Sequence, residues 1–404
     1  MPSNRSAPAQ PLKVLAVYGT RPEAIKMAPV IEALRRRPET FAVRVCTTGQ
    51  HREMLDQVQE LFGLVPDLDL QLMQPDQTLN GLSAAALAAM DRVLATEAPD
   101  WLLVQGDTTT AMTAGLAAFH RGIRVGHVEA GLRTGDLRHP FPEEANRRII
   151  DLLADALFAP TERSRQALLA EGCDPGKAYV VGNTVIDALQ AIATGAEGDE
   201  DGSGRREVLV TVHRRESFGE PIREIFSALR ELAEVFPEVD WVYPVHRNPN
   251  VRGPAHERLS GLSNLHLIEP LDYKDLVRRL ERCHLVLTDS GGIQEEAPTF
   301  GKPVLVLRET TERPEGVDAG VARLVGADRA RIVAEASRLL RSPDAYQEMA
   351  RAVNPYGDGR AAERIAAILA GERAGEGWEP FDPGASSPGS PDRESFQKAA
   401  GFPG

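Results

Sequence analysis

The sequence lacks any long apolar run. No stretch of the 404 residues approaches the ~20 consecutive apolar residues that a membrane-spanning helix needs. The first residues, MPSNRSAPAQP, are polar and interrupted by proline, and the apolar stretch LKVLAVYG that follows is too short and too poorly flanked for a secretory signal. We therefore expect no membrane partner and a cytoplasmic location.

Cysteines and metal-binding patterns are also scarce. The three cysteines, Cys46, Cys173 and Cys283, are odd in number and far apart in the chain. Such spacing suits reduced thiols better than a disulfide framework. The sequence has no CxxC or HExxH pair, and its first strand-to-helix turn, GTRPE, lacks the GxGxxG dinucleotide fingerprint. We expect no metal site, no nicotinamide and no other cofactor.

An excess of basic residues is missing as well. The 46 Lys and Arg residues are outnumbered by 59 Asp and Glu residues, which gives a formal net charge of −13. A nucleic acid or an anionic membrane would demand a basic face, so neither is an expected partner. Any anionic ligand must be held by a local site.

What the sequence does contain is an alternation of short β-rich runs with amphipathic helical stretches. Strands are expected in two series, with a polar linker at residues 195–206 between them. The first series lies at residues 13–19, 42–49, 101–106, 124–130, 156–161 and 178–183. The second series lies at residues 207–213, 240–246, 266–270, 285–292 and 303–309. This alternation predicts parallel sheets with helices on both faces. The chain is also long enough for two domains.

A Ser-Gly-Gly turn in the second series suggests a ligand. Ser290, Gly291 and Gly292 follow the apolar run at 285–287, where the chain leaves a strand and enters a helix. The unpaired backbone N–H groups of such a turn attract an anion, and phosphate is the first candidate. The alternative is a tight turn that binds nothing.

Other polar residues fall at the carboxyl ends of predicted strands. These are Arg21 after Gly19, Asp107 after Gly106, Glu129 and His213. Ligands of doubly wound folds bind outside the carboxyl ends of the strands. Taken singly, Arg21 is equally a solvated helix-start residue, Asp107 a helix N-cap, and His213 a packed or surface residue.

Two further stretches carry paired or clustered charges. In PFPEEANRR, Glu143 and Glu144 precede Arg147 and Arg148 by four residues, which surface pairing explains for one pair. We expect one pair to face the ligand cleft, and the sequence does not indicate which. His213 with two following arginines, together with Arg308 and Arg313, could form a diphosphate clamp.

Ten motifs together resemble the non-hydrolysing UDP-N-acetylglucosamine 2-epimerases. They occur in the family's order over residues 13 to about 357; they are GTRPEAIKMAP, TGQHREML, GDTTT, HVEAGLRTGD, PFPEEANRR, VGNTVIDAL, HRRES, PVHRNPNV, DSGGIQEEAP and TTERPE. A single motif would be weak support, whereas ten in order are specific.

The resemblance implies an α/β fold of two Rossmann-like doubly wound domains, of the glycosyltransferase-B type, facing each other across a cleft. The implied organisation is an N-terminal domain at 12–180, a UDP-binding domain at 181–357 and a helix at 358–371 that returns to the first domain. Residues 372–404 are rich in Gly, Pro and Ser, and we expect them to be disordered. Family members are commonly homodimers, and the resemblance also implies a place in polysaccharide biosynthesis.

The implied reaction is the reversible conversion of UDP-N-acetylglucosamine to UDP-N-acetylmannosamine by elimination and re-addition of UDP. The implied catalytic residues are Asp107, Glu129, Glu143 and His213. The implied substrate-binding residues are Arg21, Lys26, Leu271, Leu276, Ser290, Gly291, Gly292, Glu296 and Arg313. The residues that match a regulatory pocket are Gln50, His51, Arg214 and His246.

Other functions remain open on the sequence. A hydrolysing epimerase would release the free sugar, and a close relative would act on a modified UDP-hexosamine. A glycosyltransferase would need an acceptor pocket, and the acid cluster argues against it. A non-catalytic UDP-sugar sensor would use the site only for binding, although carboxylates beside a diphosphate would then weaken it.

Overall fold

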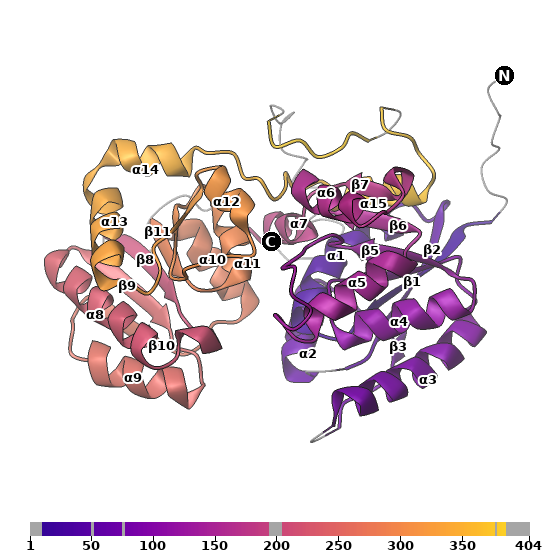
Figure 1. Cartoon of the computed structure of the whole chain (residues 1–404), viewed down its shortest axis with the longest axis horizontal. Helices are drawn as coiled ribbons and strands as arrows, with labels where there is room; N and C mark the ends of the chain where they lie inside the picture. Colours follow the sequence, from indigo (N-terminus) through magenta and orange to yellow (C-terminus); the bar gives the residue numbers. More distant parts are fainter. Residues whose placement is uncertain (1–9, 50–51, 75–76, 194–203, 376–377, 385–404) are drawn as a thin grey trace. The chain divides into compact units, whose positions relative to one another are not determined.

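The computed structural model describes residues 10–49, 52–74, 77–193, 204–375 and 378–384, and side chains are described from residue 55 onward in the second of these ranges. The chain forms two compact units (Figure 1). Unit 1 comprises Met1–Ala191 and Gly357–Gly404, and unit 2 comprises Ile192–Tyr356. The first junction lies beyond the expected position after residue 180, because the helix that follows the last strand of unit 1 packs with that unit.

Unit 1 contains a parallel sheet of seven strands in the order β3-β2-β1-β4-β5-β6-β7. The strands are β1 (Leu12–Tyr18), β2 (Phe41–Thr47), β3 (Leu68–Asp69), β4 (Trp101–Gln105), β5 (Arg124–Val128), β6 (Ala156–Ala159) and β7 (Ala178–Val180). Every residue of β4 is buried. Continuous burial is expected when helices cover both faces of a parallel sheet.

Two groups of helices cover this sheet. Helices α3, α4, α5 and α6 supply side chains to one core cluster with the sheet, whereas α1 packs against α2 and α15. The helices are α1 (Arg21–Arg35), α2 (Arg52–Leu61), α3 (Leu79–Glu97), α4 (Thr109–His120), α5 (Glu143–Leu153), α6 (Glu162–Ala170), α7 (Thr184–Ile192) and α15 (Ala361–Leu369), with a short 3-10 helix at Pro175–Lys177.

Unit 2 contains a parallel sheet of six strands in the order β10-β9-β8-β11-β12-β13. The strands are β8 (Arg206–Thr211), β9 (Val239–Pro244), β10 (Leu265–Ile268), β11 (Leu285–Thr288), β12 (Val304–Val306) and β13 (Ala322–Leu324). The helices are α8 (Glu220–Val235), α9 (Pro249–Leu259), α10 (Tyr273–Arg282), α11 (Gly291–Glu296), α12 (Pro314–Asp318), α13 (Arg329–Arg341) and α14 (Pro343–Ala350), with 3-10 helices at Arg215–Ser217 and Ala297–Phe300.

The core of unit 2 lies on both faces of its sheet. Helices α8, α9 and α13 pack in the larger cluster, and α10 and α11 pack in the smaller one. The prediction of two α/β units with doubly wound parallel sheets is therefore confirmed.

The strand order of each unit identifies where a ligand would bind. In unit 1 the chain runs outward from β1 in one direction through β2 and in the other through β4, and in unit 2 β8 has the same place between β9 and β11. Doubly wound folds bind ligands at this reversal, outside the carboxyl ends of the two central strands. The sequence positions that follow β1, β4, β8 and β11 are therefore the first candidates.

The carboxyl-terminal part of the chain differs from the expectation of a disordered tail. Helix α15 returns to unit 1, and beyond it Trp378 and Phe381 are only 9% and 7% exposed. Trp378 packs edge-on against Tyr179, and the Phe381 N–H donates to the Val180 carbonyl at 3.0 Å. Two aromatic rings bury enough apolar area to order a segment that is otherwise rich in glycine and proline. Residues 376–377 and 385–404 lie outside the described residues, as does most of the expected linker.

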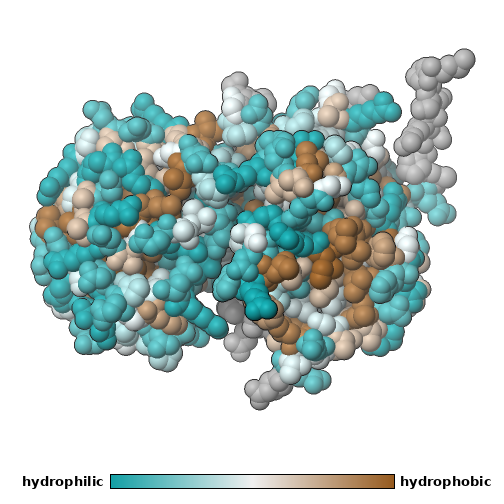
Figure 2. All heavy atoms as spheres, in the orientation of Figure 1, coloured by the Kyte–Doolittle hydropathy of each residue, from teal (hydrophilic) through white to brown (hydrophobic). Residues whose placement is uncertain are grey.

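The visible surface is largely hydrophilic on both units, with an apolar patch on unit 1 where Figure 1 places α4 and α5 (Figure 2). The exposed apolar side chains of α4 and α5 include Phe119, Ile149 and Leu152, the last of which is 84% exposed. Within the described ranges, no helix combines the length and the apolar character that crossing a bilayer requires.

Candidate functional site

Unit 1 contributes the turn between β1 and α1. Gly19 stands where a Cβ would lie 2.2 Å from the Thr48 hydroxyl, so only glycine fits. The buried Glu23 carboxylate accepts hydrogen bonds from the Gly19 and Thr20 N–H groups at 3.0 and 2.7 Å and from the Thr108 hydroxyl at 2.6 Å. Glu23 thus joins the turn after β1 to the turn after β4, and Arg21 begins α1 at this place.

Glu129 follows β5 in an unusual backbone conformation. Its φ of +69° lies in the left-handed region, where a side chain other than glycine is strained. Its carboxylate accepts hydrogen bonds from Lys26, from the Gln105 amide and from the Asn183 amide, the last at 3.2 Å. The sequence predicted Lys26 and Glu129 as site residues, and the structure brings them into an ion pair.

Asp107 follows β4 and is not a helix N-cap, because Thr108 fills that position with its hydroxyl accepting from the Ala111 N–H at 3.1 Å. The Asp107 carboxylate instead pairs with Arg147 of α5. Its backbone carbonyl accepts a hydrogen bond from the Asn146 amide at 2.9 Å. Asp107 is therefore fixed by α5 and lies beside the turn that carries Glu129.

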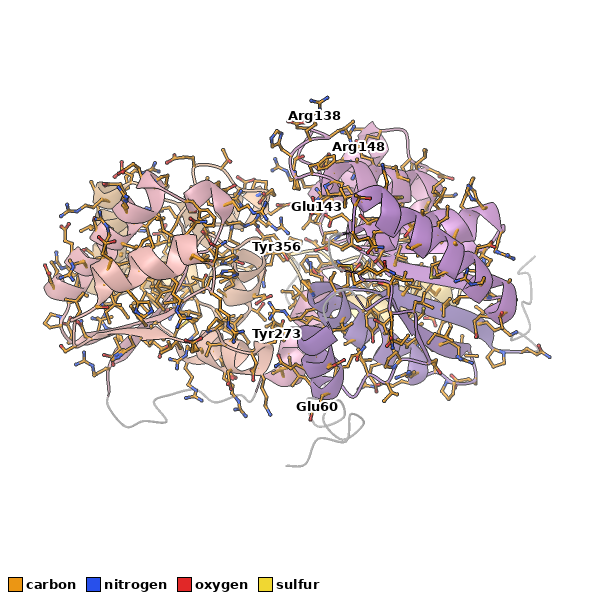
Figure 3. All side chains as sticks on the ribbon, turned by 90° about the horizontal axis from the view of Figure 1, so that it is seen from below. Glu60, Arg138, Glu143, Arg148, Tyr273 and Tyr356 are labelled. Carbon is orange, nitrogen blue, oxygen red and sulfur yellow. The ribbon has the colours of Figure 1, made fainter. Side chains whose placement is uncertain are left out.

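The structure separates the roles of the two adjacent glutamates at the start of α5. Glu144 is fully buried and pairs with both Arg147 and Arg148, at 3.0 and 3.4 Å. Glu143 has a buried oxygen, Oε2, with no hydrogen-bond partner among the described residues. Figure 3 labels Glu143 near the start of α5 and Arg148 further along the same helix. Glu143 is thus the glutamate of this pair with an unpartnered carboxylate oxygen among the described residues, whereas two arginines hold Glu144.

In unit 2 a buried aspartate organises the turn after β8. Asp289 is fully buried after β11, and it accepts hydrogen bonds from the His213 N–H at 2.9 Å, from the Arg214 N–H at 2.9 Å and from the Ser217 hydroxyl at 3.0 Å. The His213 ring nitrogen Nδ1 lies 3.6 Å from Asp289 Oδ1. The sequence analysis did not select Asp289, although it lies in the motif DSGG.

The glycine turn of unit 2 makes room for guanidinium groups. A Cβ on Gly291 would lie 3.2 Å from Arg214 Nη2 and 3.4 Å from Arg313 Cζ. A Cβ on Gly292 would lie 3.5 Å from Glu296 Oε1, and Ser290 precedes the first residue of α11. The structure therefore gathers Arg214 and Arg313 over the predicted Ser-Gly-Gly turn.

Arg313 is held firmly in this place. Its Nε donates to Glu295 Oε1 at 2.8 Å, and its backbone carbonyl accepts a hydrogen bond from the Tyr356 hydroxyl at 3.0 Å. Tyr356, labelled in Figure 3, also accepts from the Gly316 N–H at 2.8 Å, and burial raises the pKa of its phenol. Contacts of this kind fix the direction of the guanidinium group, which has the donor geometry that suits phosphate oxygens.

Arg308 shares a carboxylate with Arg313. Its guanidinium group pairs with Glu312 at 2.8 Å and with Glu216, and Arg313 Nη1 lies 3.8 Å from the same Glu312 oxygen. Burial alone would raise the pKa of Glu312, but the charges of Arg308 and Arg313 lower it to about 2. The place of Arg308 in a diphosphate clamp stays a prediction.

The remaining predicted residues are placed as follows. The His246 ring stacks on the His213 ring with centroids 5.7 Å apart, so a residue matched to a regulatory pocket touches a predicted catalytic one. Leu276 packs against the smaller core cluster of unit 2, and the half-buried Leu271 precedes α10. Gln50 and His51 lie outside the described residues.

The sequence analysis missed several residues that hold the site. Gln105 is a polar side chain that ends the apolar strand WLLVQ, and Asn183 occupies the motif VGNTVIDAL. Either signal could have been followed, but only the folded chain shows that both amides reach Glu129. No group of three or more His, Cys, Asp or Glu side chains suited to a metal ion occurs in the part of the chain that the structure describes.

Two doubly wound units, one with carboxylates at its central strand ends and one with guanidinium groups over a glycine turn, define a two-domain Rossmann-like α/β enzyme. Comparison with known proteins gives the family. A sequence profile of the UDP-N-acetylglucosamine 2-epimerases matches residues 32–370, and the chain belongs to this family. It is therefore an epimerase, which places it among the isomerases.

Individual relatives agree with the profile. The UDP-N-acetylglucosamine 2-epimerase of Salmonella typhimurium is 53% identical over 370 residues, which covers 89% of this chain and 98% of the relative. The structure of the Neisseria meningitidis enzyme bound to UDP-GlcNAc is 47% identical and superposes with a TM-score of 0.81, covering 89% of this chain and 99% of that one. The Methanocaldococcus jannaschii enzyme in complex with UDP-GlcNAc and UDP is 33% identical, with a TM-score of 0.74 over 89% of this chain and 99% of that one.

Proposed function

We propose that this protein interconverts UDP-N-acetylglucosamine and UDP-N-acetylmannosamine without hydrolysing the product. The observation that carries the proposal is the pairing of strand-end carboxylates with cations, Glu129 with Lys26 and Asp107 with Arg147, in a member of the epimerase family. Carboxylates in such an arrangement can exchange protons with a bound sugar, and neither pair is needed for nucleotide binding alone.

The chemistry explains why both carboxylates and cations are required. The C2 hydrogen of the sugar is not next to a carbonyl, so direct proton removal would leave an unstabilised carbanion. Breaking the C1–O bond expels UDP and, with loss of the C2 proton, leaves a neutral unsaturated sugar. Re-addition of UDP at C1 and of a proton to the opposite face of C2 gives the epimer. Carboxylates move the protons, and cations stabilise the departing diphosphate.

In unit 1 we assign the proton transfers to Asp107, Glu129 and Glu143. Glu129 is bound by Lys26 and by two amides, which fix the direction of its carboxylate, and we assign it to accept a proton. The buried Glu143 Oε2 lacks a hydrogen-bond partner in the described residues, and we assign Glu143 to a second proton transfer. Asp107, paired with Arg147, lies at the end of the neighbouring strand.

In unit 2 we assign the diphosphate to the Ser290–Gly292 turn. Arg313, fixed by Glu295 and Tyr356, and His213, fixed through Asp289, supply the charge and the hydrogen-bond donors that a leaving diphosphate requires. We also assign Arg21, at the start of α1 in unit 1, to substrate binding. Glu296 is assigned to the ribose hydroxyls, and the segment with Leu271 and Leu276 to the uracil through backbone groups.

The test is an NMR time course with UDP-N-acetylglucosamine in deuterated water. We expect UDP-N-acetylmannosamine with deuterium at C2, because the proton that returns comes from an exchangeable carboxyl group. Product with only its original C2 hydrogen would overturn the elimination route. Free N-acetylmannosamine would identify a hydrolysing epimerase instead, and conversion of only a modified UDP-hexosamine would change the substrate. Absence of turnover with tight UDP-sugar binding would favour a sensor.

We propose that the enzyme is regulated by its own substrate. The stacking of His246 on His213, and the place of Arg214 beside Gly291, support a link between the residues that match a regulatory pocket and those that hold the diphosphate. Gln50 and His51 complete that set. Initial rates should rise sigmoidally with substrate concentration, and a His246→Ala variant should reduce the sigmoidal character. A strictly hyperbolic wild-type curve would remove this proposal.

We also propose a homodimer that acts in the cytoplasm and supplies a nucleotide sugar for polysaccharide biosynthesis. The exposed apolar side chains of α4 and α5 support self-association, since Leu152 is 84% exposed and Phe119 is 54% exposed. Light scattering on the purified protein should give the mass of two chains, and Leu152→Glu should shift it toward one. A wild-type mass of one chain would contradict the dimer.

A further inference from the structure

A buried histidine lies directly behind the candidate carboxylates of unit 1. His127 is in β5 and is fully buried. One of its ring nitrogens, Nδ1, lies 2.6 Å from Asp151 Oδ1, and the other, Nε2, lies 2.7 Å from the Gly106 carbonyl oxygen. The proposed reaction uses neither His127 nor Asp151, so the purpose of this chain of contacts needs an explanation.

The partners of the ring define its protonation. A backbone carbonyl can only accept a hydrogen bond, so Nε2 carries a proton. Asp151 Oδ2 is occupied by Arg133 at 2.7 Å and by the Gly131 N–H at 3.3 Å. Burial alone would raise the pKa of Asp151, but the charges of His127 and Arg133 lower it below its usual range. Asp151 therefore holds the Nδ1 side of the ring, and Nε2 faces the Gly106 carbonyl.

The Gly106 carbonyl is a sensitive point for the site. Gly106 has a φ of +70° and directly precedes Asp107. The orientation of the peptide group between the two residues therefore determines the position of the Asp107 backbone, and with it the position of its side chain. The Gly106 N–H donates to the Val128 carbonyl at 3.0 Å, which ties the same peptide to the residue before Glu129. The hydrogen bond from His127 Nε2 to the Gly106 carbonyl therefore holds this peptide group in place from the buried side of the turn.

We propose that His127 is a positioning residue for Asp107, which it holds through the Gly106 carbonyl, and that Asp151 and Arg133 keep its ring in the required orientation. This inference rests on the proposed function of Asp107. Its alternative is a structural role, in which the ring only joins β5 to α5 through Asp151.

Two variants separate these roles because of their different side-chain lengths. The amide of His127→Gln reaches the position of Nε2 and can still donate to the Gly106 carbonyl. The amide of His127→Asn reaches the position of Nδ1 and keeps only the contact with Asp151. Each variant loses one of two buried hydrogen bonds, so similar losses of melting temperature are expected for both.

Catalysis should distinguish the variants where stability does not. We expect His127→Asn to lower kcat by about 10- to 100-fold with little change in KM, because a misplaced catalytic group slows the chemical step. His127→Gln should lose less than about 5-fold, since its donor to Gly106 remains. Equal losses of kcat in the two variants would overturn the positioning role. Thr113→Val, which removes a buried hydroxyl that donates to the Thr109 carbonyl at 2.7 Å, is the matched control and should retain kcat.

A double-variant cycle tests whether His127 acts through Asp107. If it does, adding His127→Asn to Asp107→Asn should lower kcat by less than about 3-fold further, because residues that act as a unit are not additive. Losses that multiply would show that His127 acts elsewhere and would overturn the inference.

A measurement on the wild-type protein does not depend on any variant being active. In nitrogen-15 NMR spectra of the histidine rings, the His127 ring should carry a proton on Nε2, and its signals should be missing from His127→Gln. A His127 ring without a proton on Nε2 would overturn the inference even if the wild type epimerises UDP-N-acetylglucosamine. A wild type that does not turn over would instead remove the proposed function and leave the ring assignment standing.

Discussion

The two units share a strand order but differ in the charge that they present at the ends of their central strands. In unit 1 the side chains at this edge are the carboxylates Asp107 and Glu129, each paired with a cation from a helix. In unit 2 the corresponding carboxylates, Asp289 and Glu295, are buried beneath the turns, and arginines lie over Gly291. The proposed function therefore assigns proton transfer to one unit and anion binding to the other, although both units have the same type of fold, because the side chains determine the chemistry.

The largest effect that sharpens this comparison is expected in unit 1. Asp107→Asn and Glu129→Gln keep the size of the side chain but remove the charge that can take a proton. They should lower kcat by ~10² or more with little change in UDP affinity. Steady-state kinetics and calorimetric titration with UDP check this, and Asp91→Asn, which changes an exposed partner of Arg121, is the control. Weakened UDP binding in the Asp107 or Glu129 variant would remove the distinction between the units.

The next effect concerns the stability of unit 1. Trp378→Ala should reduce the free energy of unfolding by about 3 kcal/mol, since a buried aromatic ring and its contact with Tyr179 are lost. Hydrogen exchange should then rise at β7, where Phe381 donates to the Val180 carbonyl, and stay unchanged in the strands of unit 2. Val65→Ala, at a side chain of unit 1 that is 75% exposed, is the control. A stable Trp378→Ala variant would show that the segment adds nothing to unit 1.

A smaller effect is expected for the guanidinium group of unit 2. Arg313→Ala should weaken UDP binding by roughly 1.5–3 kcal/mol and lower turnover with it, because a charge-assisted contact is lost. Calorimetric titration with UDP measures the change. Arg329→Ala, at an exposed partner of Glu231, should leave affinity unchanged. If Arg313→Ala lowers turnover while UDP binds as before, Arg313 does not hold the diphosphate.

The smallest expected effects concern how folding stability depends on pH, and they have opposite signs in the two units. Burial raises the pKa of Asp187 in unit 1 to about 7, so its carboxyl group favours the folded state below its ordinary pKa and this stability is lost as the pH rises through 7. Burial lowers the pKa of His284 in unit 2 to about 4, so the stability from its neutral ring is present above the ordinary pKa and is lost as the pH falls through 4.

Melting curves measured from pH 4 to 8 test this opposition. Asp187→Asn should reduce the loss of melting temperature between pH 5 and 8, and His284→Gln should reduce the loss between pH 6.5 and 4, each by roughly 2–4 °C. Parallel pH profiles for the wild type and both variants would show that neither group is coupled to folding.

The fold could be predicted from sequence to the level of two doubly wound units. Strands β1 and β4 are apolar apart from Lys13 and Gln105, and the helices between them have amphipathic patterns. This periodicity, with glycine and proline at the boundaries, was enough to predict the elements. The ordering of Trp378 and Phe381 could not be predicted, because the composition around them favours disorder and their packing partners, Tyr179 and Val180, lie far away in the chain.

The sequence by itself determined which chemical groups the site contains. Asp107, Glu129, His213 and the Ser290–Gly292 turn stand at strand ends, and ten ordered motifs indicated the family before any contact was known. The partners of the charged groups were harder to predict, because spacing alone does not show that Arg308 and Arg313 both lie beside Glu312 or that Arg313 lies beside Gly291.

Only the tertiary structure decided which of these groups act together. It paired Asp107 with Arg147, left Glu143 Oε2 without a partner in the described residues, and brought Gln105, Asn183 and Lys26 to one carboxylate. The physical reason is that ion pairs and buried hydrogen bonds depend on distances of a few ångströms between residues far apart in the chain. Spacing along a sequence fixes such distances within a helix or a strand, but not from one element to another.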